Sequence, residues 1–253
     1  MAHREKSSAN FQVFDDGVLQ KAEVVAHEEA PLHAILLLDT SSSVAGATLG
    51  HLKAAGQAFL EGLDQLDRAT LLTFSYDIRL RSGPAALPAE VAAAIDRTAA
   101  GGTTALHDAV FTALKLADPR HGRPIILIFS DGRDGTSFLS SDEVLRVARE
   151  SDVAVYVVFL AAGPVKSARF ELRSPEPPDF LRDVAKETGG RVWKATAAQE
   201  LREKFLEILS QLKNRYVLRF TPAEGARPGW HELEVRLKGR KGKVRARRGY
   251  HRQ

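Results

Sequence analysis

Between residues 32 and 213 the sequence alternates short apolar runs with segments whose apolar residues recur at helical spacing. The runs at 34–38, 124–129 and 153–159 are almost continuously apolar, as expected for parallel strands covered on both faces. Residues 106–117 carry apolar side chains at i, i+3, i+4 and i+7, which indicates an amphipathic helix. Such alternation predicts an α/β fold: a Rossmann-like, doubly wound, mostly parallel six-stranded sheet flanked by helices.

Weaker patterns complete the expected order of elements. A Ser140–Glu143 capping box predicts a helix start, and Gly189-Gly190 predicts a helix end. The further strands that we expect lie at 71–74, 78–80 and 191–194. The further helices that we expect lie near 49–63, 141–150, 179–188 and 197–212.

At both ends of the chain the apolar residues recur at every second position, unlike those of residues 32–213. Apolar residues alternate with polar ones around Asp15-Asp16-Gly17, a good hairpin signal, and again after Asn214, where three strands are expected. Neither piece alone buries enough surface to be stable. We therefore expect residues 1–31 and 214–253 to pair into a small antiparallel β-subdomain beside a domain at 32–213.

Charge and composition limit the classes of partner that we expect the protein to bind. The net charge is +4, yet residues 236–253 hold nine Lys or Arg and no acid, which leaves −5 elsewhere. A basic tail of this kind can bind nucleic acid or an anionic surface. The simpler interpretation is a solvated strand edge whose charges prevent pairing with other chains. We therefore expect no nucleic-acid partner. There is no cysteine and no apolar run of about 18 residues that would cross a membrane.

Signatures of common enzyme classes are missing. The sequence has no Gly-x-Gly-x-x-Gly after the first long strand, no phosphate-binding Gly-x-x-x-x-Gly-Lys-Ser/Thr and no Gly-x-Ser-x-Gly elbow. Its eight histidines show no ligand-like spacing. We expect a non-enzymatic protein without catalytic residues.

Polar side chains gather in three segments near expected strand and helix ends. Asp39-Thr40-Ser41-Ser42-Ser43 follows the first long strand, Gly101-Gly102-Thr103-Thr104 precedes a helix, and Ser130-Asp131-Gly132 follows the strand at 124–129. In a doubly wound sheet, ligands bind at the carboxyl ends of the strands. Two carboxylates and several hydroxyls suit a hard cation such as Mg²⁺, with Mn²⁺ or Ca²⁺ possible. A metal held by so few charges keeps a position that can accept a partner's carboxylate.

These motifs resemble the metal-ion-dependent adhesion site of von Willebrand factor A domains, in the same order along residues 32–213. The resemblance implies that Asp39, Ser41, Ser43, a threonine and Asp131 hold the metal. Family members place the threonine six residues before an apolar helix position, which selects Thr104, with Val110, over Thr103.

A narrower resemblance involves more of the chain. The segments 11–17, 132–135 and 245–250 are similar to a bacterial von Willebrand factor A-related family first described from acidobacteria. That likeness favours an exported protein, although residues 1–6 lack the apolar core of a signal peptide.

The resulting hypothesis is a divalent-metal-dependent adhesion or recognition module that binds an acidic side chain of a protein partner. The alternative is a scaffold subunit of a bacterial envelope or intracellular assembly, in which the basic tail docks a partner.

Two residues near the site have two interpretations. Asp134 either joins the site or shapes a nearby turn, and His107 either reaches a ligand or packs at the surface.

Overall fold

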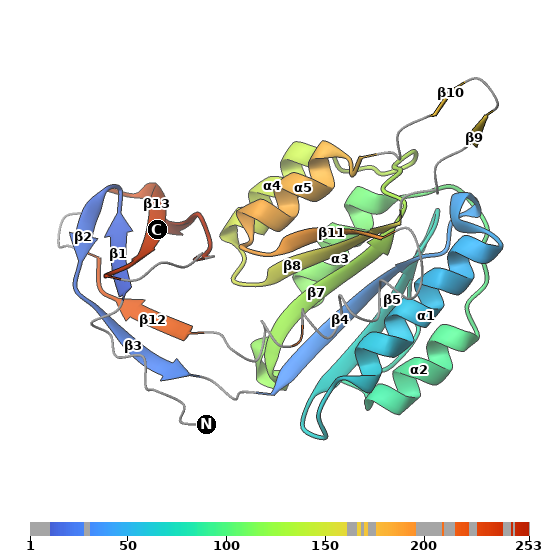
Figure 1. Ribbon diagram of the computed structural model, residues 1–253, viewed down its shortest axis with the longest axis horizontal. Helices are drawn as coiled ribbons and strands as arrows, with labels where there is room; N and C mark the ends of the chain where they lie inside the picture. The colour runs from blue at the N-terminus through green and yellow to red at the C-terminus, as the bar shows by residue number, and fades with distance from the viewer. Residues whose placement is uncertain are drawn as a thin grey trace.

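The long apolar runs form the centre of a six-stranded sheet, in the order β11-β8-β7-β4-β5-β6. Figure 1 shows the strands from β11 to β5 side by side. The strands of this sheet are β4 (Leu32–Asp39), β5 (Arg68–Phe74), β6 (Ile78–Leu80), β7 (Arg123–Ser130), β8 (Ala154–Leu160) and β11 (Arg191–Ala195). All neighbours are parallel except β5 and β6, which form an antiparallel pair at one edge. The predicted fold class is confirmed.

Helices cover both faces of this sheet. One face carries α1 (Ala47–Glu61) and α2 (Pro88–Asp96), and the other carries α3 (Leu106–Leu116), α4 (Ser141–Glu150) and α5 (Asp179–Glu187). Side chains of β4 alternate between the two: Leu36 and Leu38 pack with α1 and α2, whereas Ile35 and Leu37 pack with α3 to α5. The β4 strand is therefore apolar along most of its length because both of its faces are buried. Two short 3-10 helices are η2 (Ser42–Val44) and η3 (Pro119–His121).

The helix ends follow the local sequence. The Ser140–Glu143 capping box is present at the start of α4, as predicted. At the end of α5, Gly189 takes a φ of +76° and the Gly190 amide donates to the Ala185 carbonyl at 2.8 Å, which confirms the predicted stop. The helix α2 was not expected from the sequence, because its apolar stripe is short.

The crossovers that follow β4 and β7 run to opposite faces of the sheet, which makes a topological switch point between these two strands. The chain leaves β4 toward α1 on one face and leaves β7 toward α4 on the other, and the two strands are hydrogen-bonded neighbours. Ligands of doubly wound sheets bind at such a switch point, outside the carboxyl ends of the strands. Asp39 and Ser130 are the last residues of these two strands.

The two ends of the chain pair with each other, as predicted. One sheet has the order β14-β13-β1-β2 and another pairs β12 with β3, all antiparallel. The strands are β1 (Phe11–Asp15), β2 (Val18–Gln20), β3 (Ala22–His27), β12 (Tyr216–Phe220), β13 (Gly229–Leu237) and β14 (Gly249–Arg252). Asp16 and Gly17, with φ of 48° and 79°, form the predicted hairpin turn between β1 and β2. A short ribbon pairs β9 (Lys166–Ser167) with β10 (Phe170–Glu171).

The computed structural model describes most of the chain, and its ranges are 11–27, 31–160, 166–167, 170–171, 176–195, 209, 216–222, 227–239, 244 and 246–252. The helix expected at 197–212 lies outside these residues except for Leu209, which is buried in the same cluster as α1 and α2. Among the described helices, none combines the length and apolarity needed to cross a membrane.

Candidate metal centre

Asp39 is the buried anchor of the site. As the last residue of β4 it is 0% exposed. Its Oδ1 accepts hydrogen bonds from the Ser41 amide at 2.9 Å and the Ser41 hydroxyl at 2.7 Å. Its Oδ2 accepts from the Ser130 hydroxyl at 2.7 Å. All three donors are neutral, so hydrogen bonds orient the carboxylate but do not neutralise its charge.

A line of hydroxyls leads from Asp39 toward the surface. Ser41 Oγ lies 2.9 Å from Ser43 Oγ, and Ser43 is exposed whereas Ser41 is fully buried. Ser41 precedes η2 in an extended conformation and Ser43 lies within η2, and the short distance between their hydroxyl oxygens places both side chains on the same side. The three predicted ligands of this loop are thus brought together.

Main-chain hydrogen bonds fasten this loop to the glycine-rich loop. The Ser42 amide donates to the Gly102 carbonyl at 2.9 Å, and the Gly101 amide donates to the Thr40 carbonyl at 2.8 Å. Gly102 has a φ of +83°, and a Cβ there would lie 2.3 Å from the ring of Tyr76. Only glycine fits this position, since both the conformation and the close approach exclude a side chain. This loop connects α2 to α3 and does not directly follow a strand. Its position at the site therefore depends on its hydrogen bonds to the loop after β4.

The two candidate threonines differ in their surroundings. Thr104 is 6% exposed, and its carbonyl accepts from the amides of Gly135 and Thr136 at 2.9 and 3.1 Å. Thr103 is exposed, and its hydroxyl lies 3.3 Å from the Thr136 hydroxyl. Thr104 therefore sits where the loop meets the segment after β7, and its role as a metal ligand stays a prediction.

The segment after β7 supplies the second carboxylate. The side chain of Asp131 is 15% exposed and lies 3.6 Å from Arg133 Nε, in an ion pair whose arginine is 77% exposed. Ser130 links the two loops, because its hydroxyl donates to Asp39 while it accepts from the Gly132 amide at 2.9 Å. Sequence reasoning named this segment but missed Ser130 as the residue that positions Asp39; no local pattern reveals a contact between residues 91 positions apart.

Burial raises the pKa of Asp39 above its usual value, and the nearby charge of Asp131 adds to the shift. Hydrogen bonds from Ser130 and Ser41 act in the opposite direction. The ionised form of Asp39 is thus disfavoured in the metal-free protein, and a bound cation would relieve both the desolvation and the repulsion between the two carboxylates.

Asp134 and His107 have structural roles in this arrangement. Asp134 Oδ1 accepts from the Leu106 amide at 2.7 Å and from the Ser137 hydroxyl at 2.6 Å, so it caps the start of α3 from a distant loop. The His107 ring lies 4.4 Å from the Phe180 ring, edge to face, and its Nδ1 lies 3.2 Å from the Leu139 carbonyl. These contacts favour the interpretations of Asp134 as a loop-shaping residue and of His107 as a packed one.

The sequence of this domain matches a known family. Residues 34–133, which hold all five candidate ligands, match the family model of the von Willebrand factor type A domain. Over these residues the chain is similar to von Willebrand factor A domains. Members of this family often mediate metal-dependent interactions between proteins and are generally not enzymes. No curated protein sequence matches the chain.

Solved structures of von Willebrand factor A domains share this fold. The conserved hypothetical protein BatB from Bacteroides thetaiotaomicron is 15% identical with a TM-score of 0.58, over 73% of this chain and 100% of BatB. A von Willebrand factor type A protein from Catenulispora acidiphila is 16% identical with a TM-score of 0.57, over 80% of this chain and 46% of that one. Proximal thread matrix protein 1 from the mussel byssus, with a zinc-occupied MIDAS motif, is 14% identical with a TM-score of 0.58, over 76% of this chain and 48% of that one.

The basic tail, where it is described, is partly neutralised by the chain itself. Arg247 pairs with Asp152, Arg248 lies 4.0 Å from Glu187, and Arg236 binds Glu234 through two hydrogen bonds of 2.6 Å. These contacts support the interpretation of the tail as a strand edge that is protected by charge.

Proposed function

We propose that this von Willebrand factor A domain binds a protein partner through a divalent metal ion held by Asp39, Ser41, Ser43, Thr104 and Asp131. The observation that carries this proposal is the Asp39 carboxylate, which is fully buried yet receives only neutral hydrogen bonds. No Lys, Arg or His of the described residues forms an ion pair with it. A buried charge without a counter-ion is costly, and a bound cation would supply one.

The donor set favours Mg²⁺. It consists of carboxylate and hydroxyl oxygens, without imidazole or sulfur, and hard cations bind such ligands together with water. Mn²⁺ accepts the same ligands, and Ca²⁺ is a larger alternative. With only two carboxylates near it, the ion would keep exchangeable positions and a residual attraction for anions, and an acidic side chain of a partner fits that chemistry.

The surface beside the site offers apolar contacts for such a partner. Tyr76 packs against Gly102 and is 63% exposed, and Phe138, in the segment that follows Asp131, is 97% exposed. Exposed aromatic residues are enriched in protein interfaces, where they supply much of the binding energy. We propose that Tyr76 and Phe138 contact the partner while the metal takes its carboxylate.

The test is capture of partners on the immobilised chain in Mg²⁺ and then in EDTA. We expect a protein that is retained in Mg²⁺, is released by EDTA, and is absent when Asp39→Asn is the bait. Asp142→Asn, which removes an acid on the surface of α4, is the matched control and should capture the same protein. Retention that is unchanged by EDTA and by Asp39→Asn would show that the metal has no part in binding.

A further inference from the structure

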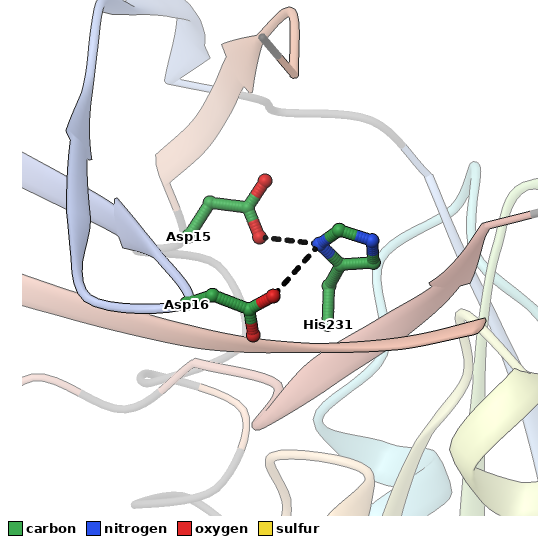
Figure 2. A group of neighbouring side chains, drawn as sticks. All are labelled: Asp15, Asp16 and His231. Atoms are coloured by element: carbon green, nitrogen blue, oxygen red, sulfur yellow. Dashed lines mark hydrogen bonds and ion pairs between the residues drawn. The ribbon is translucent and has the colours of Figure 1, made fainter. Parts of the chain in front are cut away.

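A second group of possible metal ligands lies in the sheet formed by the chain ends, away from Asp39. Figure 2 shows Asp15 from the end of β1, Asp16 from the following turn and His231 from β13. His231 Nδ1 lies 3.2 Å from Asp15 Oδ1 and 3.2 Å from Asp16 Oδ2. Asp15 is 5% exposed and His231 2%, so water does little to screen these charges. Antiparallel pairing of β1 with β13 brings together residues 216 positions apart.

The other nitrogen of His231 determines what faces the carboxylates. His231 Nε2 lies 2.7 Å from the carbonyl oxygen of Arg227. A carbonyl only accepts hydrogen bonds, so Nε2 carries the hydrogen, and Nδ1 of the neutral ring presents a lone pair. That lone pair points at two carboxylate oxygens, which are acceptors as well. The arrangement is stable only when a positive species, a proton or a metal ion, joins these three atoms.

The remaining polar atoms of the three side chains are each held by another group. Asp15 Oδ2 accepts from the Tyr250 hydroxyl at 2.9 Å, and Asp16 Oδ1 accepts from the Glu232 amide at 2.9 Å. The phenol of Tyr250 is protonated at neutral pH and therefore acts as the donor in this contact. Metal-binding histidines are oriented in this way, with the second nitrogen donating to a backbone carbonyl, and metal-binding carboxylates are likewise held by hydrogen bonds.

The separations also suit a metal. With Zn–N and Zn–O bonds of about 2.0–2.2 Å, two ligands at a tetrahedral angle lie about 3.4 Å apart. The two distances from His231 Nδ1 are close to this value, and the three candidate ligand atoms all lie within 4.8 Å of one another. One rival cation is near: Arg227 lies 3.7 Å from Asp16 Oδ2, but its side chain is 74% exposed and this ion pair is weakened by water.

We propose that Asp15, Asp16 and His231 form a second divalent metal site, which takes Zn²⁺ in preference to Mg²⁺. An imidazole nitrogen with two carboxylates suits zinc, whereas Mg²⁺ prefers oxygen ligands alone. The side chain of Asp16 is 34% exposed, which leaves a fourth position for water or an external ligand. The ion ties the first hairpin of the chain to β13 and stabilises the pairing of the two ends by binding the folded state.

The test uses the full chain with Asp39→Asn as the background, so that the other site does not contribute. We expect calorimetry with ZnCl₂ to give one bound Zn²⁺ per chain, and Asp16→Asn in this background to remove it. Asp16→Asn is a mild change, since asparagine tolerates the left-handed φ of 48° and keeps the oxygen that accepts from Glu232. His51→Gln, on α1, is the matched control and should bind Zn²⁺ as the background does.

Two further readouts make the result decisive. Tyr250→Phe should weaken Zn²⁺ affinity about 10- to 100-fold, because it removes the hydrogen bond that orients Asp15. Zn²⁺ should raise the melting temperature of the background protein but not of the Asp16→Asn protein, and EDTA should reverse the rise. The proposal is overturned if the background protein binds no Zn²⁺, in which case a proton joins the three side chains. It is also overturned if Asp16→Asn leaves the affinity unchanged.

Discussion

The charge of Asp39 sets the pH dependence of the site. Its pKa is raised in the folded protein, so without metal its contribution to stability is greatest below the ordinary value of 3.8 and is lost as pH rises through the raised pKa. A divalent ion needs the carboxylate. We therefore expect the rise in melting temperature caused by Mg²⁺ to be larger at pH 7 than near the ordinary value of 3.8, measured by thermal scans at constant ionic strength. An equal rise at both values would show that Asp39 is not a ligand.

Thr104 and Thr103 provide a matched pair of substitutions. Thr104→Ala removes the buried hydroxyl proposed to bind the metal and should lower Mg²⁺ affinity at least tenfold. Thr103→Ala removes only an exposed contact with Thr136 and should leave the affinity within about twofold. Calorimetric titrations of both variants check this. Equal losses of Mg²⁺ affinity in the two variants would contradict the choice of Thr104 over Thr103.

Ser130 should matter although we do not propose it as a ligand. Ser130→Ala leaves Asp39 Oδ2 and the Gly132 amide without their partner in a fully buried place. We expect the free energy of unfolding to fall by about 1–3 kcal/mol, the usual penalty for an unsatisfied buried group. Mg²⁺ affinity should fall with it, because Asp39 is no longer oriented. Urea denaturation with and without Mg²⁺ measures both effects, and an unchanged affinity would refute the positioning role.

At the scale of elements, the start of α3 depends on a loop far along the chain. Asp134→Ala should lower the free energy of unfolding by about 0.5–2 kcal/mol, since the Leu106 amide loses its acceptor. Asp134→Asn keeps an oxygen in the same place and should lose less than the alanine variant. Chemical denaturation of the two variants compares them. Equal stability of both with the native chain would mean that α3 needs no cap.

Elements with strong local signals were predictable, and those without were not. The strand β4 and the helix α3 each have a regular apolar pattern, and the structure has both close to the expected bounds. The missed helix α2 buries only Val91, Ala94 and Ile95, a stripe too short to stand out. The cap by Asp134 depends on contacts between segments far apart in the chain, which no local pattern encodes.

At the scale of the whole molecule, the pairing of the two ends was predictable but its chemistry was not. Period-two patterns at both ends, each too small to fold alone, predicted that they would meet. Histidine spacing gave no hint of a ligand set, because the partners of His231 lie at the other end of the chain. The divisions proposed here, 32–213 for the central domain and 1–31 with 214–253 for the β-subdomain, follow this pairing.

If the two parts carry separate sites, damage to one should spare the other. A Cβ at Gly249 would lie 2.3 Å from the His231 carbonyl oxygen and 2.3 Å from the Trp230 ring. Gly249→Ala should therefore weaken the pairing of β14 with β13 and lower the free energy of unfolding by about 1–3 kcal/mol. Mg²⁺ affinity, measured by calorimetry, should stay within about twofold of the native value. A large loss would show that the two parts act as one unit.

The central claim is that the three loops around Asp39 hold a divalent ion. Calorimetric titration of Mg²⁺ into the metal-free native chain and into Asp39→Asn tests it most directly, since Mg²⁺ is disfavoured at the histidine-containing site. We predict one Mg²⁺ per native chain and none for Asp39→Asn, while Asp39→Asn without metal is at least as stable as the native chain at neutral pH. Absence of Mg²⁺ binding to the native chain, or equal binding to both proteins, would contradict the claim.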